Sequence, residues 1–518
     1  MENNAPPLTD FNAFSINLPL AEAVSREGAG WATDRCLAVG ALVGSSEAQF
    51  HSSRAEANPP VLHRYDRFGD RIDFVERDPS WHWLVDRSIE HDLHGLPWRS
   101  KQPAHAARAA LVLQWGELSL PGICPASGNY SMVPALRASA GISEKWTPRL
   151  ISDDRSKLVF AAASLTERQG GSDVRSNKTT AHPVGDDIYS LNGLKWFITC
   201  PWAEILLVLA QAPGGLTCFM VESSSPGFRI ERLKDKLGWH SLGVGEVEFK
   251  DVPGLRLGEE GRGVGVIMRM IAYTRLDVML ESAASLRKGA LYALHQARHR
   301  HVLGRKLVDQ PAMRNVLADL ALESEAATLG AMRVARSYDE PESRFGRIAL
   351  SVLKYWISKR AAGHAAEALE CMGGNGYVTD SGLPRHLCDA ALGSVWEGSG
   401  NVAALDVLRA IRTDPESLEE FLAECQLARG GSRTLDAWVD GIRDDARLVA
   451  QSNEPEWAAR GLVERLALAL QASLLVRFSP AAVSDAFCAS RLPATSSAYG
   501  GLPAGVDVDA ILNRTLPA

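Results

Sequence analysis

The sequence predicts a mainly helical protein with a central antiparallel β-domain. Between about residues 158 and 257, short apolar segments alternate with turns rich in glycine, serine and proline, as in antiparallel β-proteins. From about residue 258 onward, apolar residues recur at every third or fourth position, which is typical of amphipathic helices. Because strands and helices are segregated rather than alternating, the pattern excludes a doubly wound nucleotide-binding fold.

Four domains follow from these changes in pattern. The first is mainly helical, and its clearest helix covers residues 105–118. The second is the β-domain, a barrel or a sandwich, and the third is a four-helix bundle. The fourth is an extra C-terminal helical domain. The predicted boundaries are 1–157, 158–257, 258–413 and 414–518.

In the β-domain, Asn192–Gly193 separates residues 187–191 from residues 194–199, which is a strong signal for a type I′ hairpin turn. Residues 261–266 lack the third glycine of the dinucleotide-binding fingerprint, and no strand is expected to precede them. Four further strands are expected, at residues 205–211, 216–222, 228–233 and 246–252.

The helical bundle is predicted from apolar stripes. A second stripe begins after Pro311, a third helix covers about residues 346–371, and a fourth follows Asn401. Further helices are expected at residues 434–451 and 458–478. The first stripe consists of Leu276, Leu280, Ala283, Leu286, Ala290, Leu294 and Ala297.

The composition is that of a soluble protein, with 46% hydrophobic and 23% charged residues. A net charge of −7 gives no general attraction to nucleic acid or to an anionic membrane. The eight cysteines form no CxxC pair and no cluster with histidine, so we expect a reducing cytoplasm and no metal site. The N-terminus has no signal-peptide pattern, and the longest apolar runs are too short to span a bilayer.

The stretch SVWEGSGN, residues 394–401, places one carboxylate, Glu397, beside an aromatic side chain and ahead of a predicted helix. Taken alone, it favours a helix cap, because acidic residues near a helix N-terminus stabilise the helix dipole. The alternative is a general base in an apolar pocket, where burial would raise its pKa toward the working pH.

Two stretches of the β-domain are candidates for ligand binding. Residues 164–174 combine hydroxyls and glycines that suit a polar, planar or phosphorylated ligand, or form an ordinary loop. Residues 195–199 form a strand with Phe197 and Thr199 on one face. This strand either covers a flavin ring or is a half-buried edge strand.

Two stretches of the bundle are candidates for phosphate binding. Residues 298–306 hold six basic side chains at a helix end, where they satisfy the helix dipole or bind a pyrophosphate. Residues 371–377 end the third helix with a glycine cluster, which is a common C-cap or offers backbone amides to a phosphate.

In this order, the stretches resemble the acyl-CoA dehydrogenase family of flavoproteins. The closer likeness is to its AidB subgroup of adaptive-response proteins, and it covers nearly the whole chain. The segments TERQGGSDVRSN, QPAMRNVL and SVWEGSGNVAALDVLR carry it. The family matches are LTE…GSDV (165–174), KWFIT (195–199), RxxLG with a following Gln (300–310), GGNGY (373–377) and WEGSGN (396–401).

The resemblance implies a β-barrel, a homotetramer and a non-covalent FAD between the barrel and the bundle. It also implies an acyl thioester substrate and an electron-transfer partner. Glu397 would be the catalytic base, removing the α-proton while the β-hydride passes to flavin N5, and Arg275 would bind substrate. Gly373 and Gly374 would reach FAD from a neighbouring subunit. The other cofactor-binding residues implied are Leu165, Thr166, Ser172, Phe197, Thr199, Arg300, Gln310, Ser399 and Asn401.

The chain departs from the family pattern at three positions. Leu303 stands where the family has Phe, and Cys388 stands where many members have Arg before the Asp. Ala272 replaces an Asp that contacts CoA in many members. These departures imply an atypical substrate that is bulky or is not carried by CoA.

Two other functions remain open at this stage. One is a DNA-binding protein of the alkylation response with residual dehydrogenase activity. Residues 411–518 hold 10 Lys and Arg against 15 Asp and Glu, a net charge of −5 that does not favour DNA binding. The other is a flavin oxidase or monooxygenase on the same scaffold.

Overall fold

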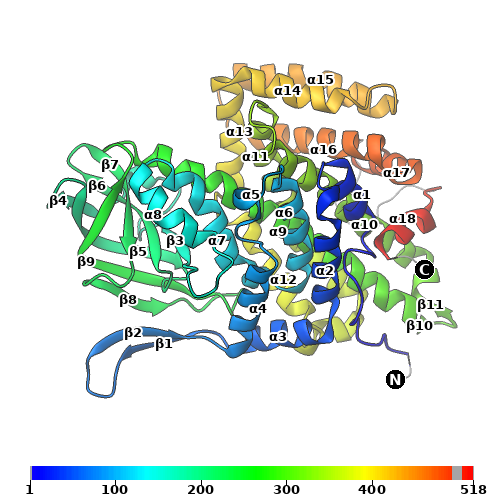
Figure 1. The fold of residues 1–518 in the computed structure, drawn as a ribbon. Helices are drawn as coiled ribbons and strands as arrows, with labels where there is room; N and C mark the ends of the chain where they lie inside the picture. The colour runs from blue at the N-terminus through cyan, green and yellow to red at the C-terminus, as the bar shows by residue number, and fades with distance from the viewer. Residues whose placement is uncertain (1–2, 493–504, 517–518) are drawn as a thin grey trace. The chain divides into compact units, whose positions relative to one another are not determined.

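The computed structural model describes residues 3–492 and 505–516 (Figure 1). The chain divides into two compact units, and this division cuts across the predicted domain boundaries, which stay predictions. The helical unit comprises residues 1–49, 102–118 and 275–518, and the β unit comprises residues 50–101 and 119–274.

The β unit contains a closed β-barrel, as the sequence predicted. Its strands are β3 (Ala161–Ser164), β4 (Thr180–Pro183), β5 (Ile188–Thr199), β6 (Ile205–Ala212), β7 (Gly215–Glu222), β8 (Phe228–Leu233) and β9 (Val244–Leu257) (Figure 1). The ring closes because β6 pairs with β7, β7 with β9, β9 with β5, β5 with β4, and β4 again with β6. β3 lies parallel to β6, and β8 is paired with β9.

Helices cover part of the barrel. β6 reads as a continuous apolar run because both of its faces are buried, and its side chains pack with those of α7 (Leu120–Leu136). The other helices of the β unit are α4 (Pro79–Glu90), α5 (Leu96–Arg99) and α8 (Ala140–Leu150), with most of α3 (Ser46–Ala57) and the first turns of α9 (Gly263–His299).

The predicted hairpin turn at Asn192–Gly193 is wrong, because β5 runs straight through both residues. Gly193 lies so close to Thr179 that a Cβ there would be 2.4 Å from its hydroxyl oxygen. The Asn192 side chain bonds Asp251 on β9, donating to its carboxylate (2.9 Å) and accepting from its backbone N–H (3.0 Å). The pair therefore marks a bulge in the ladder with β9 and a close strand approach, where glycine is also favoured.

The β unit also contains strand β1 (Val61–Tyr65), which pairs with β2 (Arg71–Glu76). One smaller expectation fails. A strand, β9, does end just before residues 261–266. It pairs only antiparallel with its neighbours, so the exclusion of a doubly wound nucleotide-binding unit holds.

The helical unit is built around the predicted bundle, α9, α10, α11 and α13 (Figure 1). All seven residues of the predicted α9 stripe are buried, and they include core residues shared with α10 and α11. Its helices are α1 (Leu18–Arg26), α2 (Thr33–Gly44), α6 (His105–Leu118), α10 (Pro311–Ser337), α11 (Phe345–Cys371), α12 (Leu383–Ala390), α13 (Gly400–Thr413), α14 (Pro415–Gln426), α15 (Arg433–Gln451), α16 (Ala459–Phe478), α17 (Ala481–Arg491) and α18 (Val508–Thr515), with the short strands β10 (His301–Val302) and β11 (Arg305–Lys306).

The C-terminal helices belong to the same compact unit as the bundle, rather than to a separate one. Leu512 of α18 lies in the bundle core with residues of α9, α10 and α11. Arg514 of α18 bonds the buried Glu325 of α10 at 2.7 and 2.8 Å. Arg491 of α17 bonds Asp319 and Glu323, which are also buried acids of α10. Arginines from the end of the chain thus neutralise carboxylates inside the bundle.

Candidate active site

Glu397 lies on a tight turn immediately before α13. The helix begins at Gly400 with Ser399 as its N-cap, so Glu397 is two residues outside the cap. Its backbone is left-handed, with φ of +53°, and Gly398 follows at +96°. A non-glycine residue in this region is strained by about 1–2 kcal/mol, and such strain is concentrated at functional sites. Glu397 is therefore not the N-cap of α13, and its role as a base stays a prediction.

Two cations bind three successive carbonyl groups of this turn, which we call the Glu397 turn (residues 396–398). Lys354 Nζ of α11 donates to the carbonyl oxygens of Trp396 (2.9 Å) and Gly398 (2.5 Å). Arg275 Nε of α9 donates to the carbonyl oxygen of Glu397 itself (2.9 Å). The carboxylate-bearing residue is thus held through its backbone from two helices.

Asp406 of α13 organises the cations beside this turn. Its carboxylate accepts from Arg275 (3.2 Å), from Arg347 (3.1 and 3.2 Å) and from the Ser351 hydroxyl (2.9 Å). Burial would raise the pKa of Asp406, but Arg347 and then Arg275 and Ser351 hold it below its usual value. Arg275, predicted to bind substrate, is therefore engaged with the protein backbone and with Asp406.

The two remaining predicted residues of this segment lie at the start of α13. Asn401 accepts a hydrogen bond from Arg460 Nε of α16 (2.8 Å), and Ser399 is partly exposed. A Cβ on Gly400 between them would lie 2.7 Å from the Lys359 side chain. The segment is therefore flanked by cationic side chains from α11 and α16.

A buried acidic cluster lies on α9 near Glu397. Asp277 forms a bidentate ion pair with Arg108 of α6 (2.6 and 2.8 Å), and both side chains are almost fully buried. One turn further along, Glu281 is also buried, and its Oε2 has no hydrogen-bond partner among the described residues. Burial, then the charges of Asp277 and Glu397, raise the pKa of Glu281 well above its usual range against the effect of Arg108. Glu281 therefore keeps its proton to a higher pH than an exposed glutamate does.

Replacement of Glu281 by Gln is expected to stabilise the protein increasingly as pH rises. The native state keeps the Glu281 proton while the unfolded state loses it above about pH 4.5, so the wild type loses stability with rising pH. Gln has no proton to lose, so the variant gains up to about 1.4 kcal/mol per pH unit relative to wild type. Unfolding free energies measured from pH 4.5 to 8 test this.

Glu117→Gln is the matched control for that series. Glu117 is a buried acid of α6 whose pKa burial raises to about 7, so the gain of Glu117→Gln should level off near pH 7. A stability difference for Glu281→Gln that does not change with pH would contradict the assignment of a proton to this side chain.

In the β unit, a buried ion pair joins the two predicted flavin-binding stretches. Lys195 Nζ donates to Glu167 (2.8 Å) and to the carbonyl oxygen of Leu209 (2.7 Å). Burial would raise the pKa of Glu167, but Lys195 lowers it to about 2, and burial lowers the pKa of Lys195 to about 8. The Trp196 N–H also donates to the Thr166 carbonyl oxygen (2.8 Å). Thr166 therefore lies directly beside the strand that carries Phe197 and Thr199.

A β-bulge turns Phe197 outward. Lys195 is opposite Val247 and Ile198 is opposite Gly245, so Trp196 and Phe197 together face one residue of β9. Ile198 is fully buried, whereas Phe197 is 50% exposed. Bulges of this kind re-aim side chains next to binding sites. The face that carries Phe197 is thus available to a ligand.

Two close contacts hold the loop that carries the predicted flavin contacts Leu165, Thr166 and Ser172. Asn177 donates to the Leu165 carbonyl oxygen (2.9 Å), and a Cβ on Gly171 would lie 2.4 Å from the Thr166 hydroxyl oxygen. Ser172 is exposed. The structure thus brings Leu165, Thr166 and Phe197 into one region of the β unit.

Four predicted cofactor residues lie together at another place in the helical unit. Arg300 donates to the backbone oxygen of Asn3 (3.2 Å), and the neighbouring Asn4 side chain is bonded by both Arg300 and Asn375. Arg300 and Gln310 enclose the β10–β11 hairpin, with Gln310 donating to the Val302 carbonyl oxygen (2.9 Å). The exposed Gly373 and Gly374 precede Asn375, and a Cβ at either glycine would meet open space.

This second group is far from Glu397 within one chain. Arg275 lies in α9 and contacts the Glu397 turn, whereas Arg300 follows directly after the end of α9. The 25 residues between them span about 37 Å of helix at 1.5 Å per residue. Within the helical unit of a single chain, the structure therefore does not bring the Arg300 group into one site with Ser399 and Asn401 beside the Glu397 turn.

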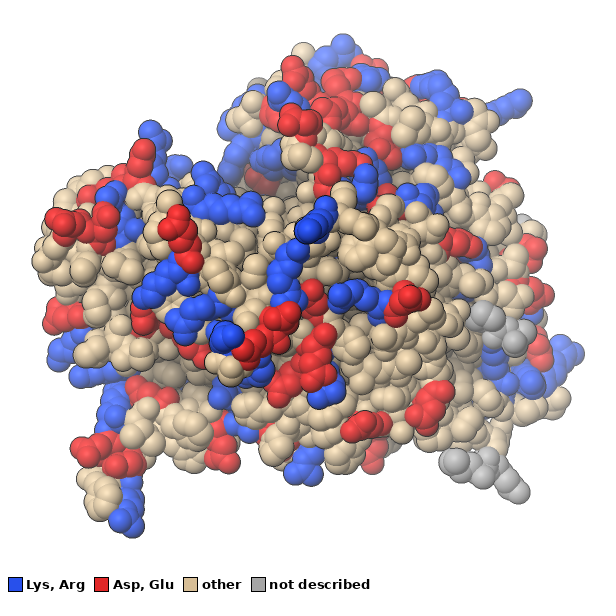
Figure 2. All heavy atoms as spheres, in the orientation of Figure 1, with Lys and Arg blue, Asp and Glu red and all other residues tan. Residues whose placement is uncertain are grey.

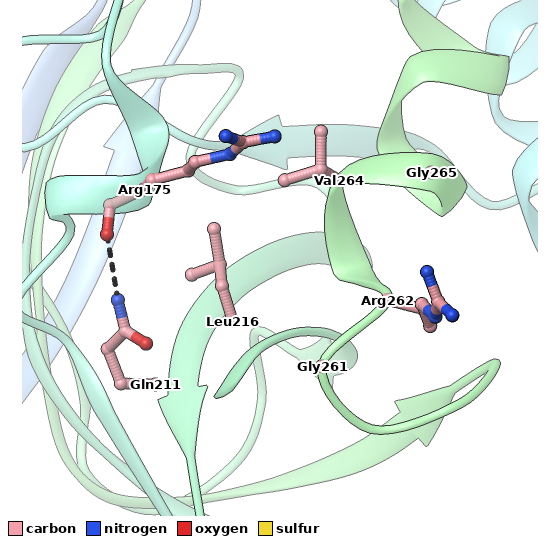
Figure 3. A pocket seen from close by; sticks show the side chains of 7 residues that line it. All are labelled: Arg175, Gln211, Leu216, Gly261, Arg262, Val264 and Gly265. Carbon is pink, nitrogen blue, oxygen red and sulfur yellow. Dashed lines mark hydrogen bonds between the residues drawn. The ribbon is translucent and has the colours of Figure 1, made fainter. Parts of the chain in front are cut away.

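A cavity of about 610 Å³ opens elsewhere in the β unit, at the start of α9 (Figure 3). Arg175 and Arg262 line it with the apolar Leu216 and Val264, and Gln211 donates to the Arg175 carbonyl oxygen (3.0 Å). None of the predicted site residues lines this cavity. Its two guanidinium groups suit an anionic ligand.

The sequence matches three protein-family models over most of its length. Residues 3–156 match the N-terminal domain of the adaptive response protein AidB, and residues 162–252 match the acyl-CoA dehydrogenase middle domain. Residues 261–412 match the acyl-CoA dehydrogenase C-terminal domain. The AidB protein of Escherichia coli (strain K12) is 35% identical over 94% of this chain and 93% of its own. The chain belongs to the acyl-CoA dehydrogenase family.

Two solved structures share the fold of this AidB-like family member. The apo form of Bd2924 superposes with a TM-score of 0.86 at 26% identity, covering 93% of this chain and all of that chain. The Caenorhabditis elegans ACDH-11 in complex with C11-CoA superposes with a TM-score of 0.85 at 23% identity, covering 99% of this chain and 92% of that chain. The AidB-like protein is thus an acyl-CoA dehydrogenase-like oxidoreductase by family.

The surface of this family member shows no extended basic face in the view of Figure 2, where acidic and basic side chains are intermingled. Four arginines in and around α15 are ion-paired with acids, so their charges are locally balanced. The pairs are Arg429–Asp440, Arg443–Glu419, Arg447–Asp444 and Arg465–Asp445. Over the described ranges, no helix has both the length and the apolar content to cross a membrane, and no cluster of potential metal ligands occurs.

Sequence reasoning missed the polar groups that position the site. Lys354 gave no signal, because it lies inside a helical pattern 42 residues before Trp396. Glu167 and Lys195 each lie in a recognised stretch, yet their pairing across 28 residues was not foreseen. In both contacts the hydrogen-bond donor is a buried lysine, and the sequence does not show that these lysines are buried.

Proposed function

We propose that this protein is an FAD-dependent acyl-CoA dehydrogenase in which Glu397 removes the α-proton of an acyl thioester. The observation that carries the proposal is the Glu397 turn, where a carboxylate-bearing residue is held in a strained conformation by Lys354 and Arg275. The family supports the reaction class, since its members act on acyl thioesters and typically bind FAD.

The β unit has residues that fit a flavin. Phe197 offers a half-exposed aromatic face, and Thr166 and Thr199 offer hydroxyls at the same end of β5. The Lys195–Glu167 pair and the Trp196 N–H fix the loop against the strand, so these groups are ordered before a ligand arrives. FAD bound there would supply the acceptor for the β-hydride.

The role of Glu397 is general base catalysis. Its side chain is partly exposed, so it keeps a route to substrate, and substrate binding would desolvate it further. Proton abstraction leaves negative charge on the thioester, and the Arg275 cation beside the turn would favour that charge. A positioned base of this kind contributes about 10²–10⁴ in rate.

A second copy of the chain would complete the cofactor site. Arg300, Gln310, Gly373 and Gly374 lie about 37 Å along α9 from the Glu397 turn, beyond the reach of one dinucleotide. Gly373 and Gly374 were expected to come from a neighbouring subunit. We extend this to Arg300 and Gln310, since Arg300 and Asn375, which follows Gly374, both bond Asn4. The assembly we propose is a homotetramer.

Purified protein is expected to be yellow and to contain one FAD per chain. Anaerobic mixing with straight, branched and aromatic acyl-CoAs should bleach the flavin with at least one of them, because the base and the flavin-binding residues are both present. Repetition in air distinguishes a dehydrogenase from an oxidase by oxygen consumption. A colourless protein that takes up no added FAD would refute the proposal.

A further inference from the structure

Lys354 is a buried cation whose ammonium group donates to two backbone carbonyl oxygens. It lies in the middle of α11, is 1% exposed, and bonds the carbonyl oxygens of Trp396 and Gly398 on either side of Glu397. Burial, and then Arg275, lower its pKa to about 8, whereas Glu397 acts in the opposite direction. A buried lysine is costly to the fold, and an apolar residue would be cheaper at this position.

The contact geometry explains the backbone of the Glu397 turn. With φ of +53° at Glu397 and +96° at Gly398, the carbonyl groups of residues 396 and 398 converge on one ammonium group. The carbonyl group between them faces Arg275. Without the ammonium group, both flanking carbonyls would have to find new donors, and the strained residue would relax to an ordinary conformation.

We propose that Lys354 is a positioning residue that holds the carboxylate of Glu397 in its reactive place by binding the carbonyl groups on both sides of it. The inference rests on the proposed role of Glu397 as the base. Lys354 does not touch the reacting atoms. Lys354 instead stabilises the left-handed backbone conformation of Glu397, which a glutamate would not otherwise adopt.

The charge of Lys354 makes this positioning dependent on pH. Charge-assisted hydrogen bonds are about twice as strong as neutral ones, so the turn is held most firmly while the ammonium group is protonated. The charged groups around it are Arg275 of α9, Glu397 of the turn, Lys359 of α11 and, through Arg275, Asp406 of α13. Activity should therefore decline as pH rises through about 8.

The test compares Lys354→Met with Lys354→Arg in the FAD-loaded protein. Met keeps the chain length and removes every donor, and relaxation of about 1–3 kcal/mol of strain corresponds to roughly a 5- to 150-fold slower flavin reduction by acyl-CoA. Substrate affinity should stay within a few fold, because Lys354 does not contact the substrate. Lys354→Arg keeps a charge at all working pH values, so the decline near pH 8 should move upward.

Lys145→Met is the control, because Lys145 is an exposed lysine on α8 of the β unit and touches neither the Glu397 turn nor Lys354. It should keep the rate and the decline near pH 8. Amide hydrogen exchange at residues 396–400 gives a readout that needs no substrate, and Lys354→Met should accelerate it. If the wild type exchanges as expected but no acyl-CoA bleaches its flavin, the proposed function fails while the positioning role stands. A Lys354→Met protein with wild-type exchange, or with the wild-type rate and pH profile, would overturn the positioning role.

Discussion

Glu397→Gln is expected to retain FAD and to lose substrate-dependent flavin bleaching by a factor of at least about 10²–10⁴, the range of a positioned general base. Gln has nearly the same shape and cannot accept the α-proton, whereas the bonds that hold the turn use backbone oxygens and remain. Stopped-flow measurement under anaerobic conditions gives the rate directly. Bleaching at the wild-type rate would remove Glu397 from the role of base.

Glu397→Gly separates the function of this residue from its effect on folding. Glycine adopts a φ of +53° without strain. The free energy of unfolding of this variant should therefore equal that of the wild type or exceed it by up to about 1–2 kcal/mol. It should nevertheless be inactive. A residue that served the fold would show the opposite pattern, with a loss of stability in the glycine variant.

Arg108→Met is expected to lower the free energy of unfolding by about 3–5 kcal/mol, the usual cost of leaving one member of a buried ion pair without its partner. Arg108 and Asp277 are each 1% exposed, and both terminal nitrogens of the Arg108 guanidinium group donate to the Asp277 carboxylate. Removal of the guanidinium group leaves the buried Asp277 carboxylate on α9 unpaired, one turn from the buried Glu281. Denaturant titration followed by tryptophan fluorescence provides the measurement.

Two comparisons test the reason for this loss. The double variant Arg108→Met, Asp277→Leu should recover much of the stability, because no charge is then left buried. Arg443→Met removes an arginine from the exposed pair with Glu419 and should cost less than about 1 kcal/mol. An Arg108→Met protein as stable as the Arg443→Met protein would show that the buried pair is not essential to the fold.

Most of the helical unit could be predicted from the sequence, because apolar residues recur at every third or fourth position over many helical turns. The α9 stripe from Leu276 to Ala297 is buried throughout, and α6 begins and ends at the expected residues, 105 and 118. Strands β6 to β9 of the barrel were also predicted, from their apolar segments, whereas β3 and β4 were not. The hairpin at Asn192–Gly193 was wrong, because a two-residue turn signal cannot reveal that Thr179 and Asp251 approach from other strands.

The candidate site was predicted only in part. Resemblance located Glu397, but the residues that give it a strained backbone come from α9 and α11 and are polar groups inside helices. Such contacts leave no periodic signal, since a single buried lysine in a helix does not alter the apolar stripe. Similarly, the bulge that exposes Phe197 depends on the register with β9, which the β5 sequence does not contain.

The arginines at the end of the chain have a consequence for protein engineering. Arg491 and Arg514 supply counter-charges to Asp319, Glu323 and Glu325 within α10, and Arg460 reaches Asn401 near Glu397. A minimal version cut after residue 412, where the family match stops, would take these arginines from the buried Asp319 and Glu325, while Glu323 would keep Arg360 of α11. Swapping this tail between relatives would therefore succeed only when the acids of α10 are transplanted with it.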